Sequence, residues 1–415
     1  MKIVKIALVG AGNRGYEAFG KEILKRNDVR FVAVAEPDKG KRERLSKEHN
    51  IPEDMQFNSY EELFARKKLA DGVIVATMDS MHLEPTTMAL KKGYKVLLEK
   101  PIGIKLEEVK KIVCASEKTG LPVLVGHVLR YTSYLKKIKE LLGSGIIGKL
   151  ISIDHRENVG YWHFAHSYTR GNWRNTDVAA PAILAKSCHD MDLLYWLAGA
   201  RCKILTSLGG LFYFKKENAP KKSAGRCMDC PEKIESACPY SAKKLYLTDN
   251  VDWPTSVISL DHSLKARKKA LREGPYGRCV YKCDNNVADH QVVLMDFENE
   301  IKVSFTMSAF NVSTRDIRIS GSHGEIRSSF DKFIEVIKFD GSRREKYKKI
   351  DMAPVPAESH GGGDQGLTEA FVKVLQGGKP PFTIQESAHS HFMAFAAEKS
   401  RLKNGIPVQV KEFEK

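Results

Sequence analysis

A glycine spacing near the N-terminus is typical of phosphate-binding turns. The pattern G-x-G-x-x-G begins at Gly10, directly after the apolar run 3–9 and just before a stretch of helical periodicity, 16–25. In this motif the glycines allow a tight turn, close approach of the backbone to a pyrophosphate, and close packing of helix on strand. The helix N-terminus then presents free N–H groups to phosphates. The expected contact residues are Gly10, Gly12, Asn13, Arg14 and Gly15. The alternative is a glycine-rich turn without a nucleotide.

An acidic residue indicates which dinucleotide the turn would take. Glu36 ends the second predicted buried strand, 31–35, and lies 21 residues after Gly15. A carboxylate at this place accepts hydrogen bonds from the adenosine ribose and repels a 2′-phosphate. NAD is therefore expected, while the nearby basic residues Lys39, Lys41 and Arg42 leave NADP open.

A cysteine cluster is the second chemical signal. Five of the eight cysteines lie between 227 and 283, in the pattern C-x2-C-x7-C followed later by C-x3-C. Such spacing is typical of metal ligands, and thiolates favour tetrahedral zinc, which could fold a segment too polar to form its own core. The expected ligands are Cys227, Cys230, Cys238 and Cys283, or Cys279 in place of the last. An iron–sulfur cluster, reduced free thiols and a disulfide pair are the alternatives.

The elements that would position these residues fall into two parts. Predicted strands and helices alternate up to residue 126, which indicates a doubly wound parallel sheet of Rossmann type. After that, strand-like alternation dominates over 202–339, with a helix at 188–198. We expect an α/β protein with a Rossmann domain at 1–126. The second α/β domain, 127–415, would have an open, mostly antiparallel sheet and a cysteine-rich insert at about 214–285.

Composition excludes several classes of protein. The chain has 415 residues, 42% hydrophobic and 28% charged, with a net charge of +16. This is an ordinary globular composition, and no apolar run is long enough to span a membrane. The basic runs are spread along the chain without a nucleic-acid-binding motif, so we expect neither a nucleic-acid partner nor a membrane partner. The short N-terminal apolar stretch contains charges and leads into the glycine turn, which favours a cytoplasmic protein over a secreted one.

Further motifs give the chain a family resemblance. VGAGNRG, GVIVATMDSMH, VLLEKPIG at 96–103 and SCHDMDLLYWLAG at 187–199 together resemble the glucose–fructose oxidoreductase / inositol dehydrogenase / rhizopine catabolism (Gfo/Idh/MocA) family. The likeness covers nearly the whole chain outside roughly 214–285. It implies an NAD(P)-dependent oxidoreductase of sugars, inositols or related polyols, and a homo-oligomer, dimeric or tetrameric.

The resemblance also assigns the catalytic residues. The lysine of the EKP motif and a histidine of the second domain flank the nicotinamide in this family, and here they correspond to Lys100 and His189. We expect His189 to act as acid/base and Lys100 to hold the substrate oxygen. The family usually has an aspartate four residues before the histidine, whereas this chain has Ala185 followed by Lys186. Beyond the glycine turn and Glu36, the expected cofactor contacts are Thr77, His82, Glu99 and Lys100.

A second group of residues suits a polyhydroxylated ligand. The segment 155–175 interleaves aromatic rings, which pack on sugar C–H faces, with donors that bind hydroxyls. The alternative is a structured loop with core aromatics. The expected substrate-binding residues are His127, Arg130, His166, Tyr168, Arg170, Trp173, Arg174 and Lys186.

Three functions are consistent with these features. The leading one is hydride transfer between nicotinamide and a secondary hydroxyl or carbonyl of a sugar or polyol. The second is a redox-assisted glycosidase that binds NAD tightly and recycles it. The third is a NAD-bound sensor that has lost catalysis, which the alanine at position 185 favours.

Overall fold

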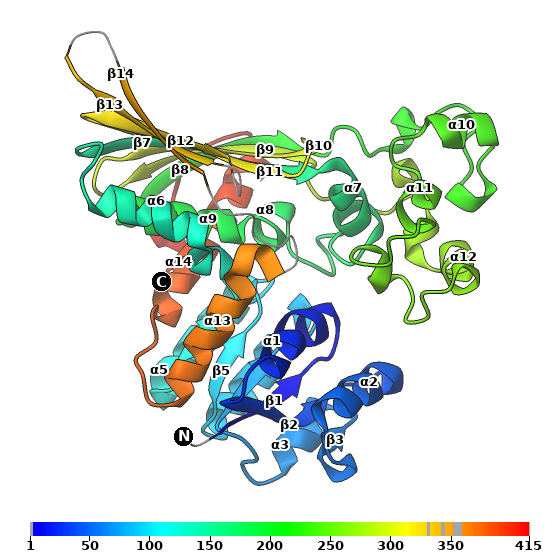
Figure 1. The fold of residues 1–415 in the computed structure, drawn as a ribbon. Helices are drawn as coiled ribbons and strands as arrows, with labels where there is room; N and C mark the ends of the chain where they lie inside the picture. Colours follow the sequence, from blue (N-terminus) through cyan, green and yellow to red (C-terminus); the bar gives the residue numbers. More distant parts are fainter. Residues whose placement is uncertain (1–2, 330–332, 342–344, 352–358, 415) are drawn as a thin grey trace.

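Two sheets organise the molecule in the computed structural model, which describes residues 3–329, 333–341, 345–351 and 359–414. A parallel sheet occupies one end, a larger mixed sheet lies across the other, and a helical lobe extends from the larger sheet (Figure 1). This arrangement confirms the predicted fold class.

The first sheet has six parallel strands in the order β3-β2-β1-β4-β5-β6, which is the Rossmann order. Its strands are β1 (Val4–Val9), β2 (Val29–Ala35), β3 (Gln56–Phe57), β4 (Gly72–Val75), β5 (Lys95–Leu98) and β6 (Val123–Val125). The helical segments between them are η1 (Arg14–Gly20), α1 (Lys21–Leu24), α2 (Lys39–His49), α3 (Tyr60–Ala65), α4 (Leu83–Lys91) and α5 (Leu106–Thr119).

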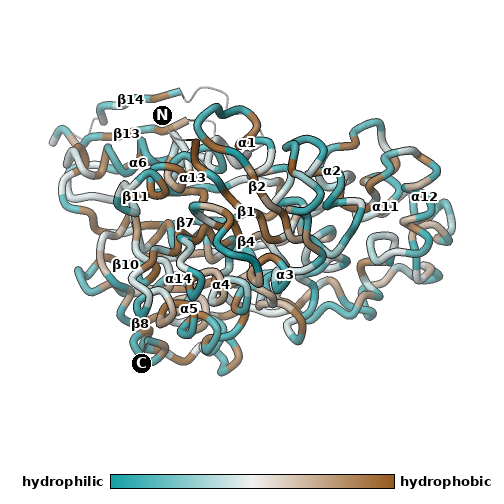
Figure 2. Tube along the Cα trace, turned by 90° about the horizontal axis from the view of Figure 1, so that it is seen from below, coloured by the Kyte–Doolittle hydropathy of each residue, from teal (hydrophilic) through white to brown (hydrophobic). Residues whose placement is uncertain are grey.

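The central strands of this sheet are apolar because both of their faces are covered. Val73, Ile74 and Val75 of β4 are all fully buried. Figure 2 shows the same hydrophobic colouring along β1 and β2. Such runs are typical of parallel strands with helices on both sides.

The second sheet has nine strands in the order β14-β13-β12-β11-β7-β10-β9-β8-β15. Among the described strands of this sheet, only β7 and β10 pair in parallel, so it is mixed but mostly antiparallel. Its strands are β7 (Leu150–Gly160), β8 (Cys202–Gly210), β9 (His290–Phe297), β10 (Lys302–Asn311), β11 (Thr314–Gly321), β12 (Gly324–Ser329), β13 (Phe333–Phe339), β14 (Glu345–Asp351) and β15 (Val408–Gln409). Helices α6 (Ser133–Gly143), α9 (Cys188–Ala198) and α14 (Ile384–Leu402) lie on one side of it (Figure 1).

One late helix returns to the first sheet. Helix α13 (Ser359–Leu375) packs Leu367, Phe371 and Val372 into the same buried cluster as β1 and β4. The approach is close at Gly72, where a Cβ would stand 2.6 Å from Leu375 Cδ2. The last part of the chain thus completes the helix layer over the nucleotide-binding sheet.

The cysteine-rich insert forms its own lobe (Figure 1). It holds α10 (Glu232–Ala237), α11 (Ala242–Tyr246) and α12 (Leu264–Glu273). Its separate hydrophobic cluster has only four buried members, Cys227, Ala242, Tyr246 and Leu271. Among the short helices α7 (Tyr161–Phe164), η5 (Ala165–Arg170) and α8 (Ala182–Ala185), α7 lies between this lobe and the second sheet, and α8 lies beside α9 (Figure 1).

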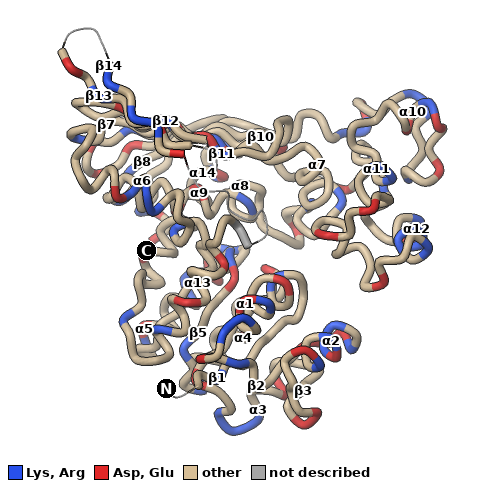
Figure 3. Tube along the Cα trace, viewed as in Figure 1, with Lys and Arg blue, Asp and Glu red and all other residues tan. Residues whose placement is uncertain are grey.

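Charges are dispersed over the molecule. Lysine and arginine alternate with acidic residues along most elements, including α2 and α10 (Figure 3). In the described ranges, no helix has the length and apolar character needed to cross a membrane.

Candidate active site

The glycine-rich turn is packed so tightly that two of its glycines have no room for a side chain. Gly10 has φ +93°, and a Cβ there would lie 2.6 Å from the carbonyl oxygen of Ala76. A Cβ on Gly15 would lie 2.0 Å from the Gly10 oxygen. At Gly12, by contrast, no described atom stands within 4 Å of the Cβ position. The open side of Gly12 fits the close approach of a pyrophosphate that the motif predicts.

Glu36 lies at the end of β2, directly against this turn. Its Oε2 accepts a hydrogen bond from the Ala11 N–H at 2.7 Å, and its Oε1 accepts one from the Asp38 N–H at 3.0 Å. The Arg42 guanidinium is bonded to the carbonyl oxygen of Glu36, which fixes this cation beside the same corner. The carboxylate is therefore held where it would meet an adenosine ribose.

Thr77 and His82 form the neighbouring wall after β4. His82 is buried, and its two ring nitrogens lie 2.6 Å from the Pro101 oxygen and 3.3 Å from the Thr77 oxygen. The Thr77 hydroxyl is buried and makes no hydrogen bond with any described residue. An unsatisfied buried hydroxyl beside the glycine turn is suited to a ligand partner.

Arg14 joins the turn to helix α13 and to the EKP motif. Its Nε donates to Glu99 Oε1 at 2.7 Å, and its Nη2 donates to Asp364 Oδ1 at 2.6 Å. These acidic partners raise its pKa despite burial. Arg14 and Glu99, both predicted to contact the cofactor, pair with each other beside the turn. Asn13 begins helix η1 without a side-chain cap.

Lys100 reaches the segment that carries His189. Its Nζ donates to the carbonyl oxygen of Ala185 at 2.9 Å, across from the first domain to helix α8. His189 follows four residues later, on the first turn of α9, and is 7% exposed. The contact joins Lys100 to helix α8, in the segment of the second domain that leads into α9 and His189.

A group of buried charges surrounds Lys186. Its Nζ lies 3.3 Å from Glu157 Oε1, and Arg315 Nε lies 2.5 Å from the other oxygen of the same carboxylate. Arg315 also contacts Asp190 at 3.0 Å. Burial lowers the pKa of Lys186, although Glu157 opposes this. Sequence analysis did not single out Glu157 or Arg315, because they lie on β7 and β11 and meet only through sheet pairing.

Aromatic residues of the predicted substrate segment close one side of the site. Trp173 donates its indole N–H to Asp79 Oδ2 at 2.6 Å, and burial raises the pKa of this carboxyl group. Tyr168 is buried, and burial, with Asp79 and Cys188 nearby, raises the pKa of its hydroxyl. Asp79 is a further residue that sequence analysis did not single out, although it stands two residues after Thr77.

His163 also faces the lysines. Burial lowers its pKa well below the ordinary value, and Lys186, Arg315 and Lys100 lower it further. The ring lies 4.8 Å from that of Trp253, a residue of the insert. His163 is therefore a neutral donor and acceptor next to three cations.

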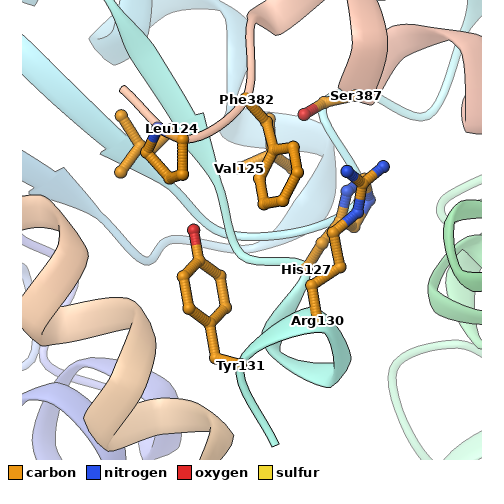
Figure 4. A pocket seen from close by; sticks show the side chains of 8 residues that line it. Leu124, Val125, His127, Arg130, Tyr131, Phe382 and Ser387 are labelled. Carbon is orange, nitrogen blue, oxygen red and sulfur yellow. The ribbon is translucent and has the colours of Figure 1, made fainter. Parts of the chain in front are cut away.

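The side chains of His127 and Arg130 both bind the carboxylate of Asp192. Arg130 forms two hydrogen bonds of 2.6 Å with Asp192, and His127 Nδ1 lies 3.0 Å from the same group. Burial raises the pKa of Asp192, but the charges of His127 and Arg130 outweigh it and hold the pKa below its usual range. Both residues line a hollow of about 250 Å³ with Tyr131 and Phe382 (Figure 4). Lys100 and His189 do not line this hollow.

Three other predicted substrate residues face the insert. His166 lies 2.7 Å from the Tyr246 hydroxyl and stacks on Tyr276 at 4.7 Å. Arg174 pairs with Asp284 at 2.7 Å. Arg170 is fully buried and bonds to carbonyl groups on both sides of the insert. These side chains anchor the lobe instead of lining the space around Lys100.

Two groups of potential metal ligands can be tested against the structure. His127, Cys188 and His391 bring ligand atoms within 4.8 Å of one another. However, His391 Nε2 accepts from the Ile102 N–H at 2.8 Å and its Nδ1 lies 3.1 Å from the Ser387 oxygen, so both nitrogens are in use. Burial raises the pKa of the Cys188 thiol to about 12. This group is therefore a packed, hydrogen-bonded cluster.

The insert cysteines do not have the geometry of a zinc site. Among the described residues, no three of their sulfurs lie within 4.8 Å of one another. Four thiolates around zinc would stand about 3.8 Å apart, given bonds of about 2.3 Å in a tetrahedron. The predicted zinc site is not supported by this arrangement.

The chain combines a Rossmann sheet that carries a glycine-rich turn with a second domain built on a mixed sheet. This combination defines a class of two-domain proteins with an NAD-binding fold. Residues 4–127 match the model of the oxidoreductase family with an NAD-binding Rossmann fold, and residues 139–410 match the C-terminal alpha/beta domain of the same family. The chain belongs to this Gfo/Idh/MocA oxidoreductase family, as its motifs predicted.

Curated relatives are distant. A 2,7-anhydro-N-acetylneuraminate hydratase of Mediterraneibacter gnavus is 26% identical over 51% of this chain and 53% of its own length. The chain thus spans about half the length of this relative. The putative oxidoreductase YteT of Bacillus subtilis is 23% identical over 78% of this chain and 76% of its own length.

Solved structures share the fold over nearly the full length of this chain and of their own. An oxidoreductase from Agrobacterium radiobacter in complex with NAD+, L-tartaric acid and magnesium gives a TM-score of 0.70 at 16% identity, with 99% of each chain covered. A scyllo-inositol dehydrogenase from Lactobacillus casei with bound NAD(H) and scyllo-inositol gives 0.68 at 17% identity, covering 99% of this chain and all of the other.

Proposed function

We propose that this protein is an NAD-dependent oxidoreductase that interconverts a secondary hydroxyl and a carbonyl on a sugar, inositol or related polyol. One observation carries the proposal: Lys100, from the end of the nucleotide-binding sheet, contacts the segment of the second domain that presents His189. The bound inositol and NAD(H) of the L. casei relative support the substrate class.

The cofactor residues fit a dinucleotide. Gly12 and the first turn of η1 would take the pyrophosphate, Glu36 the adenosine ribose, and the free hydroxyl of Thr77 a further polar group. Bound NAD supplies a nicotinamide that accepts or returns a hydride. NAD is proposed over NADP because Glu36 would repel a 2′-phosphate.

The protein side chains handle the proton and orient the substrate. Lys100 would hold the reacting oxygen, since its ammonium stabilises negative charge there. His189 would take or return the hydroxyl proton, because a histidine titrates near neutral pH. Tyr168, Trp173 and the neutral His163 would form the wall that receives the ring of the substrate.

The test is turnover with matched variants. The full chain is mixed with NAD and a panel of inositols, hexoses and sugar acids, and absorbance at the NADH band is followed. Lys100→Met and His189→Asn should each lower kcat/KM about 10²–10³-fold. Lys111→Met, on the exposed face of α5, should leave it unchanged. Equal activity of Lys100→Met and wild type would refute the assignment.

A second candidate is a reaction without net oxidation. The relatives named as anhydroneuraminate hydratases favour it, since hydration leaves the redox state of substrate and cofactor unchanged. A NAD-recycling glycosidase or hydratase would consume its substrate without accumulating NADH. Product analysis by mass spectrometry on the same panel distinguishes the two.

A further inference from the structure

The strongest feature outside the proposed active site is a cavity in the insert lined by four cysteines. Cys227, Cys230, Cys238 and Cys279 border one hollow of about 360 Å³, which includes its open mouth. Cys283 does not line it, and its sulfur lies 3.3 Å from the Cys279 carbonyl oxygen instead. Four cysteines from three segments therefore border one space.

The local backbone holds these thiols in place. Cys227 starts the turn η7 (Cys227–Asp229), and the Cys230 N–H closes it on the Cys227 oxygen. A β-bridge between Arg226 and Arg278 brings Cys279 beside Cys227, although they are far apart in sequence. Cys238 follows directly after α10.

Cys227, Cys238 and Cys279 are neighbours, but in the described residues their sulfurs do not form a group as tight as one tetrahedral ion needs. Burial raises the pKa of the Cys238 thiol, and the proximity of Cys227 and Cys279 raises it further. Within the described residues, no three of the sulfurs lie within 4.8 Å of one another. A tetrahedral zinc ion needs sulfurs about 3.8 Å apart. The terminal sulfurs of a cubane iron–sulfur cluster stand about 6 Å apart, because the inorganic core lies between them.

A buried cation beside the cavity supplies an independent argument. Arg170 is fully buried and lines the hollow, and its Nη2 stands 3.6 Å from Cys227 Sγ. Its other partners are neutral: the carbonyl groups of Tyr240 and Arg278, and the hydroxyl group of Tyr246. Its Nη1 makes no hydrogen bond to a described residue.

Two other interior arginines are each paired with a carboxylate. Arg130 is paired with Asp192, and Arg315 is paired with Glu157. In the described part of the chain, no ion pair joins Arg170 to a carboxylate. Glu235 also lines the hollow, but it is bonded to Ser241 and lies 3.6 Å from Lys243. A buried guanidinium needs a negative partner, and a cluster bound by four thiolates carries net negative charge.

A bound group would also add to the stability of the insert, which reaches the main core near its edges, through Phe214, Val280 and Tyr281. Its own hydrophobic cluster is small, with four buried members and five partly buried residues packed against them. A bound inorganic cluster would supply that free energy and would also neutralise Arg170.

We propose that Cys227, Cys230, Cys238 and Cys279 bind an iron–sulfur cluster. Its role is structural: it folds the insert and, through Arg170, fixes the end of η5, the helix that carries Tyr168. The proposal does not depend on the proposed function, since it concerns other residues and requires no substrate.

The experiment uses the full chain, produced with added iron and purified without oxygen. Iron, acid-labile sulfide and zinc are measured per chain, with the visible absorption spectrum. We expect equal amounts of iron and sulfide, two or four of each, and an absorption band near ~400 nm. One zinc per chain without sulfide, or no metal at all under these conditions, would overturn the proposal.

Variants then test the ligand set. Cys230→Ser and Cys238→Ser should lose at least about four-fifths of the iron and the visible band, while Cys283→Ser and Cys114→Ser keep both. NAD binding by the first domain, measured on the same samples, shows that the chain has folded outside the insert. Loss of iron in Cys283→Ser equal to that in Cys238→Ser would overturn the assigned set.

Discussion

The nucleotide-binding corner and the cysteine-rich insert are held together by different physical means. The corner rests on a sheet whose strands are fully buried, and its glycines are fixed by backbone contacts. The insert has a four-member core and relies on buried polar groups such as Arg170 and His166. Apolar burial therefore supports most of the first region, whereas buried polar groups replace part of the hydrophobic core in the second.

The largest effect should follow from removing the buried arginine of the insert. Arg170→Met leaves the carbonyl groups of Tyr240 and Arg278 without their donor, which should destabilise the insert by about 3–5 kcal/mol. Hydrogen exchange over 214–285 would show it, with little change in β1 and β4.

The matched control is Arg174→Met, whose partner Asp284 is half exposed. An exposed pair contributes about 0–1 kcal/mol, so exchange in the insert should barely change. Equal effects of the two variants would mean that the insert does not depend on its buried charge.

A methyl group at Gly15 should disrupt the corner to a similar degree. Its Cβ would overlap the Gly10 oxygen, and overpacking of this kind costs about 3 kcal/mol in unfolding free energy. Gly12→Ala should keep wild-type stability, because its Cβ position is open, and yet weaken NAD binding about tenfold or more. Denaturant melts and calorimetric titration with NAD separate the two effects. A stable Gly15→Ala protein that binds NAD normally would contradict the packing argument.

Acid should weaken the insert through His166. Burial lowers the pKa of this ring to about 3, so the folded insert keeps it neutral, while the unfolded chain binds a proton near pH 6.5. The contribution of His166 to the stability of the insert is then fully present above pH 6.5 and is lost as the pH falls towards 3. Between pH 7 and 5 this group alone should cost about 2 kcal/mol of opening free energy.

Hydrogen exchange of the insert at the two pH values tests this, with His166→Gln as the comparison. The variant should lose most of the pH dependence contributed by this residue. An unchanged dependence would place the effect elsewhere.

The smallest effect concerns cofactor choice at the corner. Glu36→Gln keeps an acceptor for the Ala11 N–H but removes the charge that repels a 2′-phosphate. The ratio of the Kd for NADP to the Kd for NAD should fall about tenfold, equivalent to about 1.4 kcal/mol. Glu43→Gln, exposed on α2, should leave the ratio unchanged. If the ratio of the two Kd values is the same in Glu36→Gln as in the wild type, Glu36 does not determine the preference for NAD.

The sequence predicted best where local pattern and structure coincide. Strand β1, the glycine turn and Glu36 lie within one βαβ unit, so their contacts follow from short-range spacing. The pairing of Arg14 with Asp364 joins residues 350 positions apart and could not be read from the motif. The same holds for Arg315 and Glu157, which meet only through the register of β11 and β7.

The sequence also does not show in which direction each side chain of a segment points, and this limited the prediction of the site. His166 and Arg170 share a segment with Tyr168, and composition alone assigned all three to the substrate. The helix turns the first two towards the insert and Tyr168 towards Asp79 and Cys188. Likewise, the cysteine spacing predicted metal ligands, but the separation of the sulfurs, which distinguishes zinc from a larger group, is a property of the folded lobe.

Because helix α13 packs on the first sheet, it determines which fragments of the chain could fold on their own. A fragment ending near residue 126 would leave uncovered the surface of β1 and β4 on which Leu367 and Phe371 pack. At Gly72, water or a neighbouring chain would replace the side chain of Leu375. An autonomous nucleotide-binding module would therefore have to be built as a fusion that grafts residues 359–375 onto 1–126, and simple truncation should yield an aggregating product.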